Sequence, residues 1–308
     1  MKEIVIISGK GGTGKTSITA ALAAIASRKH RMVFADCDVD ASDLHLVFNP
    51  EVLETKDFYS GHVARIDPQK CISYGECTVC KDLCRFDSIR YSHTTGMVID
   101  ETACEGCGVC VRFCPARAIE FPDRYCGESF VSNTRFGPLV HAALDIGAEN
   151  SGKLVTLVRT AAKKIAEKGI SGTGENPPAE YLIVDGSPGT GCPVIASITG
   201  CDAVVIVTEP TLSGLHDLER VVALAKHFSI PAYVCVNKYD INEAQSNEII
   251  AWCEAHGVPV LGTVPWHRSI TSAQIEGLSV VEYAEKHGET TVPDAMRTIW
   301  ENLWELTQ

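Results

Sequence analysis

Short, unbroken runs of apolar residues recur along the chain, and most of them end in a polar residue or glycine. A run of this kind is typical of a strand that is buried on both faces of a parallel sheet. Stretches with apolar residues at helical spacing lie between several of these runs. The predicted strands are 4–7, 32–35, 181–185, 203–207 and 232–236, and the predicted helices are 18–25, 154–166, 214–228 and 242–256. This alternation predicts an α/β protein.

A glycine-rich loop connects the first predicted strand to the first predicted helix. It contains the pattern G-x-x-x-x-G-K-[ST] at Gly9, Gly14, Lys15 and Thr16. In such a loop the glycines let the backbone approach phosphate groups, the lysine reaches the β- and γ-phosphate oxygens, and the hydroxyl ligates Mg²⁺. Because strand, loop and helix are contiguous, the loop amides and the helix N-terminus can converge on one anion. The predicted nucleotide-binding residues of the loop are Gly11, Gly12, Thr13, Gly14, Lys15, Thr16 and Ser17.

Aspartates follow two of the predicted strands. Asp38 comes after strand 32–35, and Asp185 is the last residue of strand 181–185. An aspartate at the carboxyl end of a parallel strand lies beside the phosphate crevice, where it can hold a water molecule or Mg²⁺. Asp185 and Thr16 are therefore the predicted Mg²⁺ ligands. Asp38 has two alternatives, because it could belong to a solvated acidic loop or cap a helix.

The sequence changes character between residues 63 and 122. Apolar segments shorten there, and eight cysteines appear in two half-repeats. The second half-repeat has the spacing C-x₂-C-x₂-C-x₃-C-P, the signature of a bacterial [4Fe–4S] ferredoxin, at Cys104, Cys107, Cys110 and Cys114. The first half-repeat has a longer first loop, with spacings x₅, x₂ and x₃, at Cys71, Cys77, Cys80 and Cys84.

Two metal chemistries suit this cysteine-rich segment. Zinc is the alternative for any such module, but two quasi-repeats that both end in C-x₃-C favour iron–sulfur clusters. Residues 88–91 and 97–100 are predicted to form the two short strands of a hairpin, as in a two-cluster ferredoxin.

Two strings of residues identify a family resemblance. The loop K-G-G-T-G-K-T at residues 10–16 resembles the deviant Walker A loop of the MinD/ParA/Mrp/nitrogenase-iron-protein group, of the SIMIBI class, and D-G-S-P-G-T-G at 185–191 resembles its switch II. The resemblance implies a doubly wound, mostly parallel P-loop sheet built from residues 1–62 and 123–308. A small α+β domain with two [4Fe–4S] clusters, residues 63–122, is then inserted into it.

The same resemblance implies roles for individual residues. Lys10 would reach across a nucleotide-sandwich dimer to the partner's phosphates, and Asp38 would position the attacking water, so the predicted catalytic residues are Lys10, Lys15 and Asp38. By the crossed ligation of two-cluster ferredoxins, one cluster would be held by Cys71, Cys77, Cys80 and Cys114. The other would be held by Cys84, Cys104, Cys107 and Cys110. The longer first loop leaves open whether Cys71 is a ligand.

Base recognition is ambiguous in the sequence. Strand 232–236 is followed by N-K-x-D, from Asn237 to Asp240, and in GTPases this motif reads guanine. In the resembled group, an asparagine at this strand end commonly contacts adenine, and Asp240 could instead be the N-cap of helix 242–256. We therefore expect ATP rather than GTP, with Asn237 and Asp240 as candidate nucleotide-binding residues.

Two further segments have more than one interpretation. Cys192 lies just past switch II, near the position where the nitrogenase iron protein has a cluster-bridging cysteine, but it could equally be a small core residue like the remaining cysteines. Residues 147–153 nearly repeat the phosphate loop, yet Leu154 replaces the Mg²⁺-ligating hydroxyl. This second loop is not expected to bind ATP.

Composition limits the partners and the compartment. The chain has 308 residues, of which 45% are hydrophobic, and a formal net charge of −12, which argues against a nucleic-acid partner. No apolar run is long enough for a membrane span, and the N-terminus enters a strand without a basic leader, so a cytoplasmic location is expected. Because cytosolic thiols are kept reduced, the fourteen cysteines are not expected to pair as disulfides. Residues 295–306 are expected to pack on the protein's own core.

Three functions remain open. The first is an ATPase whose nucleotide-dependent dimer gates electron transfer from two [4Fe–4S] clusters to a redox partner. The second is an assembly or carrier ATPase that delivers iron–sulfur or metal cofactors to a client protein. The third is a redox-regulated nucleotide switch without net electron delivery. The dimer could be a homodimer or a heterodimer with a paralogue.

Overall fold

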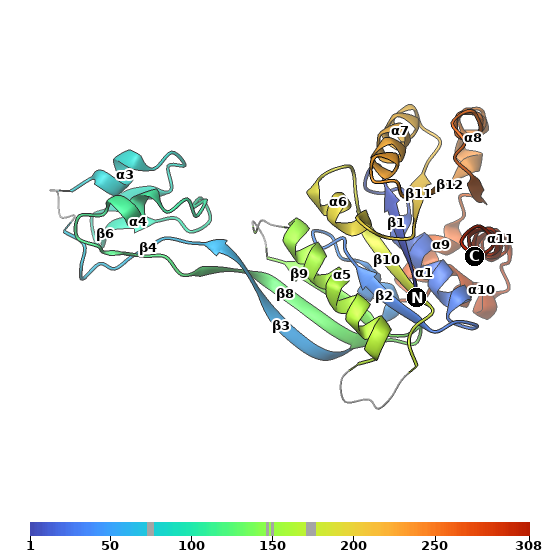
Figure 1. The fold of residues 1–308 in the computed structure, drawn as a ribbon, viewed down its shortest axis with the longest axis horizontal. Helices are drawn as coiled ribbons and strands as arrows, with labels where there is room; N and C mark the ends of the chain where they lie inside the picture. The colour runs from blue at the N-terminus through green and yellow to red at the C-terminus, as the bar shows by residue number, and fades with distance from the viewer. Residues whose placement is uncertain (73–76, 146–147, 149–150, 171–176) are drawn as a thin grey trace. The chain divides into compact units, whose positions relative to one another are not determined.

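The chain forms two compact units. The computed structural model describes residues 1–308 except 73–76, 146–147, 149–150 and 171–176 (Figure 1). The first, here called the sheet unit, comprises Met1–Lys56, Glu128–Ala143 and Ser151–Gln308, and the second, the cysteine unit, comprises Asp57–Gly127 and Leu144–Asn150. The boundaries between them fall inside or at the end of strands: β3 (Glu51–His62), β8 (Asp123–Asn133) and β9 (Leu139–Leu144). The domain limits predicted at residues 63 and 122 stay a prediction.

One large sheet organises the sheet unit. Among the described residues, nine strands lie in the order β13-β12-β11-β1-β10-β2-β9-β8-β3. Neighbouring strands from β13 to β9 pair in parallel. The bounds of the strands not yet given are β1 (Lys2–Ser8), β2 (Met32–Asp36), β10 (Tyr181–Pro188), β11 (Ala203–Thr208), β12 (Ala232–Asn237) and β13 (Val260–Val264). The predicted α/β fold with a mostly parallel sheet is confirmed.

The apolar runs form the central strands. In β1 the residues Ile4 to Ile7 are at most 1% exposed, as expected for a strand with helices on both faces. All five predicted strands are present, as β1, β2, β10, β11 and β12. Strand β3 was not predicted because its sequence is mostly polar and almost all of its residues are exposed.

Helices cover both faces of the sheet, which makes it doubly wound. Alternate side chains of a strand point to opposite faces, and Ile4 and Ile6 of β1 pack into one cluster with α1, α10 and α11. Helices α5, α6 and α7 contact the strands from the opposite side (Figure 1). The helix bounds in this unit are α1 (Lys15–Ala26), α2 (Leu44–Phe48), α5 (Ser151–Lys168), α6 (Cys192–Ile198), α7 (Leu212–His227), α8 (Glu243–Ala255), α9 (Arg268–Ile275), α10 (Val280–His287) and α11 (Thr291–Leu306).

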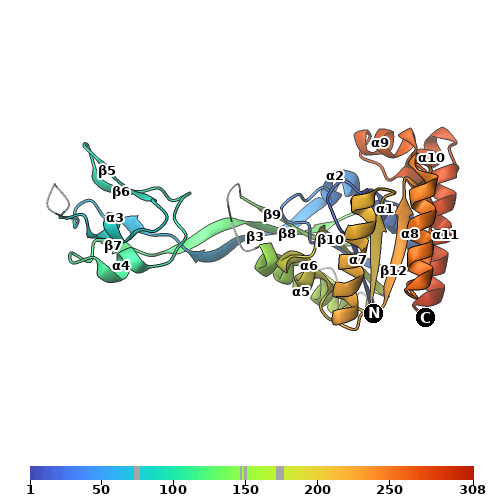
Figure 2. The ribbon, with the colours of Figure 1, turned by 90° about the horizontal axis from the view of Figure 1, so that it is seen from above.

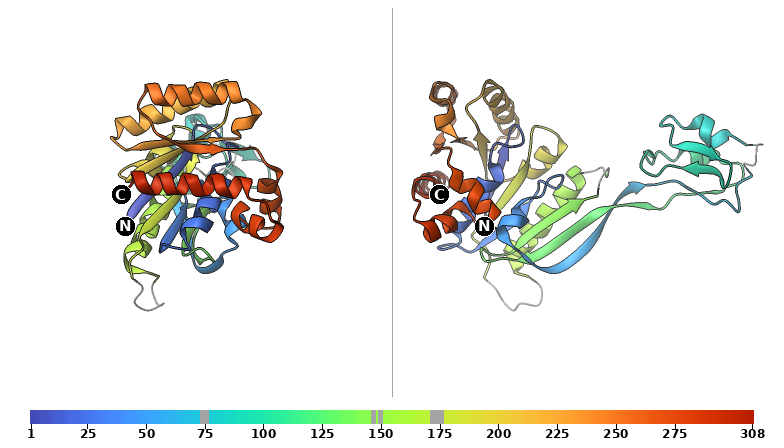
Figure 3. Two further views of the ribbon diagram at one scale, coloured as in Figure 1. Left: turned by 90° about the vertical axis from the view of Figure 1, so that its right-hand side faces the viewer. Right: turned by 180° about the vertical axis from the view of Figure 1, so that it is seen from behind.

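The C-terminal helix packs on the core, as expected. Helix α11 buries Met296, Ile299, Trp300 and Leu303, and Figures 2 and 3 show the two chain termini side by side. Lys2 Nζ donates a hydrogen bond to the carbonyl oxygen of Gln308 at 3.2 Å. Within the part of the chain that is described, no helix is both long and apolar enough to cross a membrane.

The cysteine unit is small and built from two similar halves. The first half gives α3 (Val79–Leu83) and the hairpin of β5 (Ile89–Ser92) and β6 (Gly96–Ile99). The second gives α4 (Val109–Phe113) and β7 (Ile119–Glu120), which pairs antiparallel with β4 (Arg65–Ile66). The predicted hairpin is therefore confirmed. The second glycine loop considered above, 147–153, lies partly outside the described residues.

A buried ion pair ties the first strand to two helices. Arg159 of α5, 7% exposed, contacts both carboxylate oxygens of Glu3, 2% exposed, at 2.5 and 2.7 Å. Arg159 also donates to the carbonyl oxygens of Ala196 and Thr199 at the end of α6, at 3.1 and 2.6 Å. Lys163 is a second partner of Glu3, at 2.8 Å. The guanidinium thus joins β1, α5 and α6.

We expect Arg159→Ala to lower the free energy of unfolding by about 3–5 kcal/mol. The buried carboxylate of Glu3 then loses Arg159 and keeps Lys163 as its charged partner. Denaturant titration of the variant measures this loss. Arg297→Ala is the matched control, since Arg297 pairs with Asp294 at an exposed site and should change stability by no more than about 0.5 kcal/mol. Equal effects of the two substitutions would contradict a structural role for the buried pair.

Candidate nucleotide site and cysteine cavities

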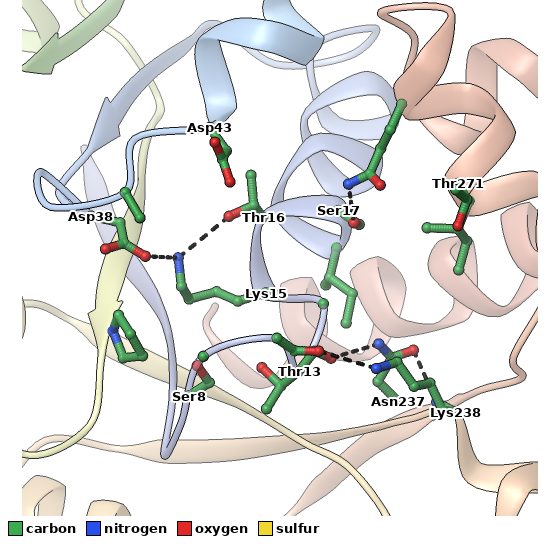
Figure 4. Close-up of a pocket in the computed structure, with 18 of the residues that line it drawn as sticks. Ser8, Thr13, Lys15, Thr16, Ser17, Asp38, Asp43, Asn237, Lys238 and Thr271 are labelled. Atoms are coloured by element: carbon green, nitrogen blue, oxygen red, sulfur yellow. Dashed lines mark hydrogen bonds and ion pairs between the residues drawn. The ribbon is translucent and has the colours of Figure 1, made fainter. Parts of the chain in front are cut away.

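A cavity of about 560 Å³ opens at the carboxyl ends of the central strands. The glycine-rich loop after β1 forms one wall of it, and residues of the loops after β2, β10, β12 and β13 form the others (Figure 4). Ligand sites of doubly wound sheets lie at this edge, because the strand order reverses there and helices diverge. The cavity therefore contains the nucleotide-loop residues that the sequence predicted.

Two glycines of the loop are required by its geometry. Gly14 precedes α1 with φ +91°, and a Cβ there would lie 2.3 Å from Asn237 Nδ2. A Cβ on Gly9 would lie 2.4 Å from the Cβ of Asp217 in α7. Any side chain at these positions would displace a neighbour, so the loop keeps its shape only with glycine.

Lys15 is buried among carboxylates. Its Nζ lies 2.8 Å from Asp185 Oδ1 and 3.5 Å from Asp38 Oδ2, and Figure 4 shows the ammonium between Asp38 and Thr16. Burial by itself lowers the pKa of Lys15, but the charges of Asp185, Asp38 and Asp36 outweigh it and raise the pKa. The lysine is therefore held in its charged form, as phosphate binding requires.

Asp185 also contacts the hydroxyl predicted to bind Mg²⁺. Thr16 Oγ1 donates to Asp185 Oδ2 at 2.7 Å, so both predicted Mg²⁺ ligands converge on one point. Mg²⁺ takes only one or two protein ligands when phosphates and water complete its shell. The oxygen donors of Thr16 and Asp185 fit such an ion.

Asp36 is a site residue that sequence reasoning missed. It is fully buried at the end of β2 and accepts hydrogen bonds from Ser42 Oγ at 2.8 Å and from the backbone N–H groups of Asp38 and Leu44. Burial, then the charge of Asp185, raises the pKa of Asp36 to about 7. Burial also raises the pKa of Asp38, against the charge of Lys15. Asp36 fixes the loop that carries Asp38. The available signal in the sequence was its position two residues before Asp38, directly after the predicted strand 32–35.

The loop has room and an unused polar group for a phosphate. Thr13 Oγ1 is buried and, among the residues described, is the buried side-chain oxygen or nitrogen that lacks a hydrogen-bond partner. A Cβ added to Gly11 would meet no atom within 4 Å. An orphaned hydroxyl costs free energy unless a ligand satisfies it, so the cradle fits a bound phosphate chain.

The N-K-x-D residues contact the protein itself. Asn237 Nδ2 donates to the carbonyl oxygen of Thr13 at 2.7 Å, and Lys238 Nζ donates to that of Gly12 at 3.1 Å. Asp240 Oδ1 accepts from the backbone N–H of Trp266 at 2.6 Å, and Asp240 is not among the residues that line the cavity.

The alternative role of Asp240 as the N-cap of helix 242–256 is wrong. The N-cap of α8 is Asn242, whose side chain accepts from the backbone N–H of Gln245. Asp240 lies in a 3₁₀ turn, Tyr239–Ile241, two residues before that position. The sequence also missed the far wall of the cavity, where Trp266, His267 and Gln274 lie. Gln274 Nε2 donates to Ser17 Oγ at 2.9 Å.

Lys10 lies at the rim of the site and contacts its own chain. Its Nζ is 2.7 Å from Glu209 Oε1, 3.0 Å from Ser213 Oγ and 3.4 Å from Thr211 Oγ1. Burial alone raises the pKa of Glu209, but hydrogen bonds from Lys10 and Lys238 hold it below its usual range. Within one chain, Lys10 is thus directed toward the start of α7.

The eight cysteines of the cysteine unit line two cavities. One cavity is lined by Cys71, Cys77, Cys80 and Cys114, and the other by Cys84, Cys104, Cys107 and Cys110. These two sets are the ones that crossed ligation implies, and Cys71 lies with its set although residues 73–76 are outside the described part. Apolar residues such as Ile66, Met97 and Ile119 surround the cysteines.

Each cavity has four cysteine thiols in its lining. In the described residues, no three ligand side chains converge as one metal ion would require. Four is the number of thiolates that a four-iron cluster takes.

The remaining cysteines mostly belong to the core. Cys37, Cys126, Cys201, Cys235 and Cys253 are buried, as predicted, whereas Cys192 is exposed at the first residue of α6.

Fold and site together define a class, a nucleotide-binding α/β protein with its phosphate loop at the carboxyl edge of a parallel sheet. The family model "CobQ/CobB/MinD/ParA nucleotide binding domain" matches residues 4–280. The chain therefore belongs to the CobQ/CobB/MinD/ParA nucleotide-binding family.

Individual relatives give further comparisons. The chain is 33% identical over 240 residues to the uncharacterized protein MJ0578 of Methanocaldococcus jannaschii, a match that covers 78% of this chain and 79% of that protein. It is 30% identical over 138 residues to the iron–sulfur cluster carrier protein of Pyrococcus furiosus, covering 40% of this chain and 45% of that one. The septum site-determining protein MinD of Pyrococcus horikoshii, solved with Mg-ADP, aligns with TM-score 0.57 and 18% identity over 99% of this chain and 96% of that chain. At that identity, the likeness shows the fold alone.

We expect Asp240→Ala to weaken ATP and GTP binding by the same factor, at most about tenfold, because the variant loses a hydrogen bond to the Trp266 loop and not a contact to a base. Titration of both nucleotides against the variant measures the two affinities. Glu243→Ala, an exposed carboxylate in the first turn of α8, is the control and should leave both unchanged. Loss of GTP binding alone would show that Asp240 reads guanine.

Proposed function

We propose that this protein is an ATP-binding and ATP-hydrolysing iron–sulfur protein, in which a nucleotide-sandwich dimer gates electron transfer from two [4Fe–4S] clusters to a redox partner. The observation that carries the proposal is the pair of four-cysteine cavities in a chain that also has a phosphate loop. The family membership supports nucleotide binding, and the cysteine unit supplies the reason to assign redox chemistry.

The nucleotide part of the mechanism follows from the loop residues. Lys15 and the loop amides would bind the phosphates, while Thr16 and Asp185 would hold Mg²⁺. Asp38 would orient the attacking water, because its carboxylate lies beside Lys15 on a loop that Asp36 fixes. Asn237 would support the base end by holding Thr13 in place. ATP is proposed over GTP because Asp240 is already engaged by Trp266.

Dimerisation would bring the second lysine into use. The Lys10 side chain is 32% exposed, and Lys10 directly precedes Gly11, which lines the cavity, so a phosphate of a facing chain can approach it. In the proposed dimer each Lys10 stabilises negative charge on the partner's nucleotide during hydrolysis. The facing chain would be a second copy or a paralogue.

The two cysteine cavities would hold the redox groups. We propose that residues 63–122 are a ferredoxin-like domain, with one cluster on each set of four cysteines. When bound, [4Fe–4S] clusters supply one-electron transfer at potentials set by their surroundings. The chain's own contribution is an apolar shell, with Ile66 and Ile119 at one cavity and Ile89 and Ile99 at the other.

The main alternative is an assembly ATPase that delivers clusters to a client. The partial similarity to an iron–sulfur cluster carrier protein favours it. Against it, Cys80, Cys104 and Cys110 are buried in the core of the cysteine unit. If a cluster were transferred to a client, these buried cysteines would lose the group that they pack around. We therefore prefer clusters that stay bound to this protein. A redox-regulated switch without electron delivery is the third possibility.

Anaerobically prepared protein is expected to contain about eight irons and eight acid-labile sulfides per chain, as two four-iron cubes require. Iron and sulfide assays measure both. Cys107→Ser should lose about half of the iron, because it removes a ligand of only one cubic cluster. The control is Cys192→Ser, because Cys192 is exposed and lines neither cavity. Zinc in place of iron would contradict the redox proposal, because Zn²⁺ does not transfer electrons.

Mg-ATP, but not Mg-ADP, is expected to change the midpoint potential or the chelation rate of at least one cluster, because dimer closure alters the charge and solvent exposure around it. Anaerobic redox titration and a chelation time course measure the change. Asp38→Ala should still respond to ATP, since its phosphate cradle is intact, and Lys15→Ala should not. Identical behaviour in every nucleotide state would eliminate the gated carrier and leave the assembly ATPase.

A further inference from the structure

Glu209 links two lysines that border the phosphate loop. Its Oε1 lies 2.7 Å from Lys10 Nζ, and its Oε2 lies 3.2 Å from Lys238 Nζ. The Glu209 side chain is 18% exposed, and those of Lys10 and Lys238 are 32% and 28% exposed. One carboxylate therefore pairs with both ammonium groups and balances only one of their two positive charges.

The hydrogen bonds of Lys10 are all used within its own chain. An ammonium group has three N–H donors, and Lys10 has three acceptors, Glu209 together with the hydroxyls of Thr211 and Ser213. To donate to any other group, Lys10 must break at least one of these bonds. The ionic bond to Glu209 is the strongest of them, because a charged acceptor roughly doubles the strength of a hydrogen bond.

The segment that carries Glu209 is held firmly. Thr211 Oγ1 accepts from the backbone N–H of Gly214 and caps α7. A Cβ on Gly214 would lie 2.2 Å from the carbonyl oxygen of Glu209, so the turn closes tightly on itself. The backbone that carries Glu209 is therefore tied to the start of α7.

We infer that Glu209 is a brake on nucleotide-dependent dimerisation, which holds the Lys10 ammonium against its own chain until a phosphate of the facing chain's nucleotide displaces the carboxylate. This inference rests on the proposed sandwich dimer. A partly exposed ion pair is weak, and a polyphosphate carries more negative charge than one carboxylate, so the exchange is reversible and favours the phosphate only when nucleotide is present.

Lys238 does not carry this effect. Lys238 also donates a hydrogen bond to the carbonyl oxygen of Gly12 at 3.1 Å. We therefore expect Lys238 to stay bound to the phosphate loop when Glu209 is removed, and we expect the effect on dimerisation to come from Lys10.

The first experiment measures the contact itself, in single chains without nucleotide. Brief acetylation followed by peptide mass spectrometry gives the labelling rate of Lys10 relative to Lys164, an exposed lysine on α5. Glu209→Gln is expected to raise the Lys10 rate about two- to five-fold, in line with loss of a partly exposed ion pair. Glu219→Gln removes an equal charge from an exposed position on α7 and should leave the rate unchanged. An unchanged rate in Glu209→Gln overturns the brake.

The second experiment measures dimerisation by sedimentation as Mg-ATP is added. Glu209→Gln is expected to dimerise about two- to five-fold more tightly than the parent, and Glu219→Gln like the parent. Adding Glu209→Gln to Lys10→Ala should have no further effect, because the brake acts through Lys10. Weaker dimerisation of Glu209→Gln overturns the brake. If the parent itself stays monomeric with Mg-ATP, the sandwich dimer of the proposed function fails, and with it the brake, even when the labelling result shows the contact.

Discussion

The structure depends on a buried positive charge at the carboxyl edge of the sheet. Lys15 is 5% exposed and is compensated by Asp185 and Asp38, with Asp36 close behind. An uncompensated ammonium at this depth would cost several kcal/mol. The strands β2 and β10 and the loop that follows β2 must therefore supply carboxylates, and the same carboxylates can hold Mg²⁺ and water around a nucleotide. The carboxylates that stabilise the buried Lys15 are therefore the same groups that would act in the chemistry of the site.

The cysteine unit has only a small apolar core, and several of its cysteines are part of that core. It is too small to bury a large apolar core, since a short segment buries little of its surface, and its described core includes Cys80, Cys104 and Cys110 among a few aliphatic residues. Clusters bound by these thiols would add covalent cross-links between the two half-repeats, because crossed ligation joins residues of one half to the other. Metal binding and folding of this unit are thus expected to be coupled.

Glu209 pairs with Lys10, the lysine that would contact the nucleotide of the other chain in the proposed dimer. Lys15 is compensated by residues that nucleotide binding needs, whereas Lys10 is compensated by a residue that the proposed dimer must replace. The difference follows from exposure: Lys15 is buried among its carboxylates, whereas the Lys10 side chain is 32% exposed, so an anion from another chain can reach it. The two lysines of this loop therefore differ in the anions that can reach them: Lys15 is reached within its own chain, and Lys10 also from a facing chain.

The sequence alone determined the central strands and the phosphate loop, because apolar runs and glycine spacing are local signals, and it indicated the two cysteine sets through their spacing. It did not determine β3, whose residues are mostly polar and gain their order only by pairing in the sheet. Nor did it reveal Asp36 as the anchor of its loop, Trp266 as a cavity wall, or Glu209 as the partner of Lys10. Asp240 had two local interpretations, and its contact with Trp266, 26 positions along the chain, matches neither. Apart from those of Asp36, which span at most eight positions, these contacts join residues far apart in the chain, so only the tertiary structure could decide them.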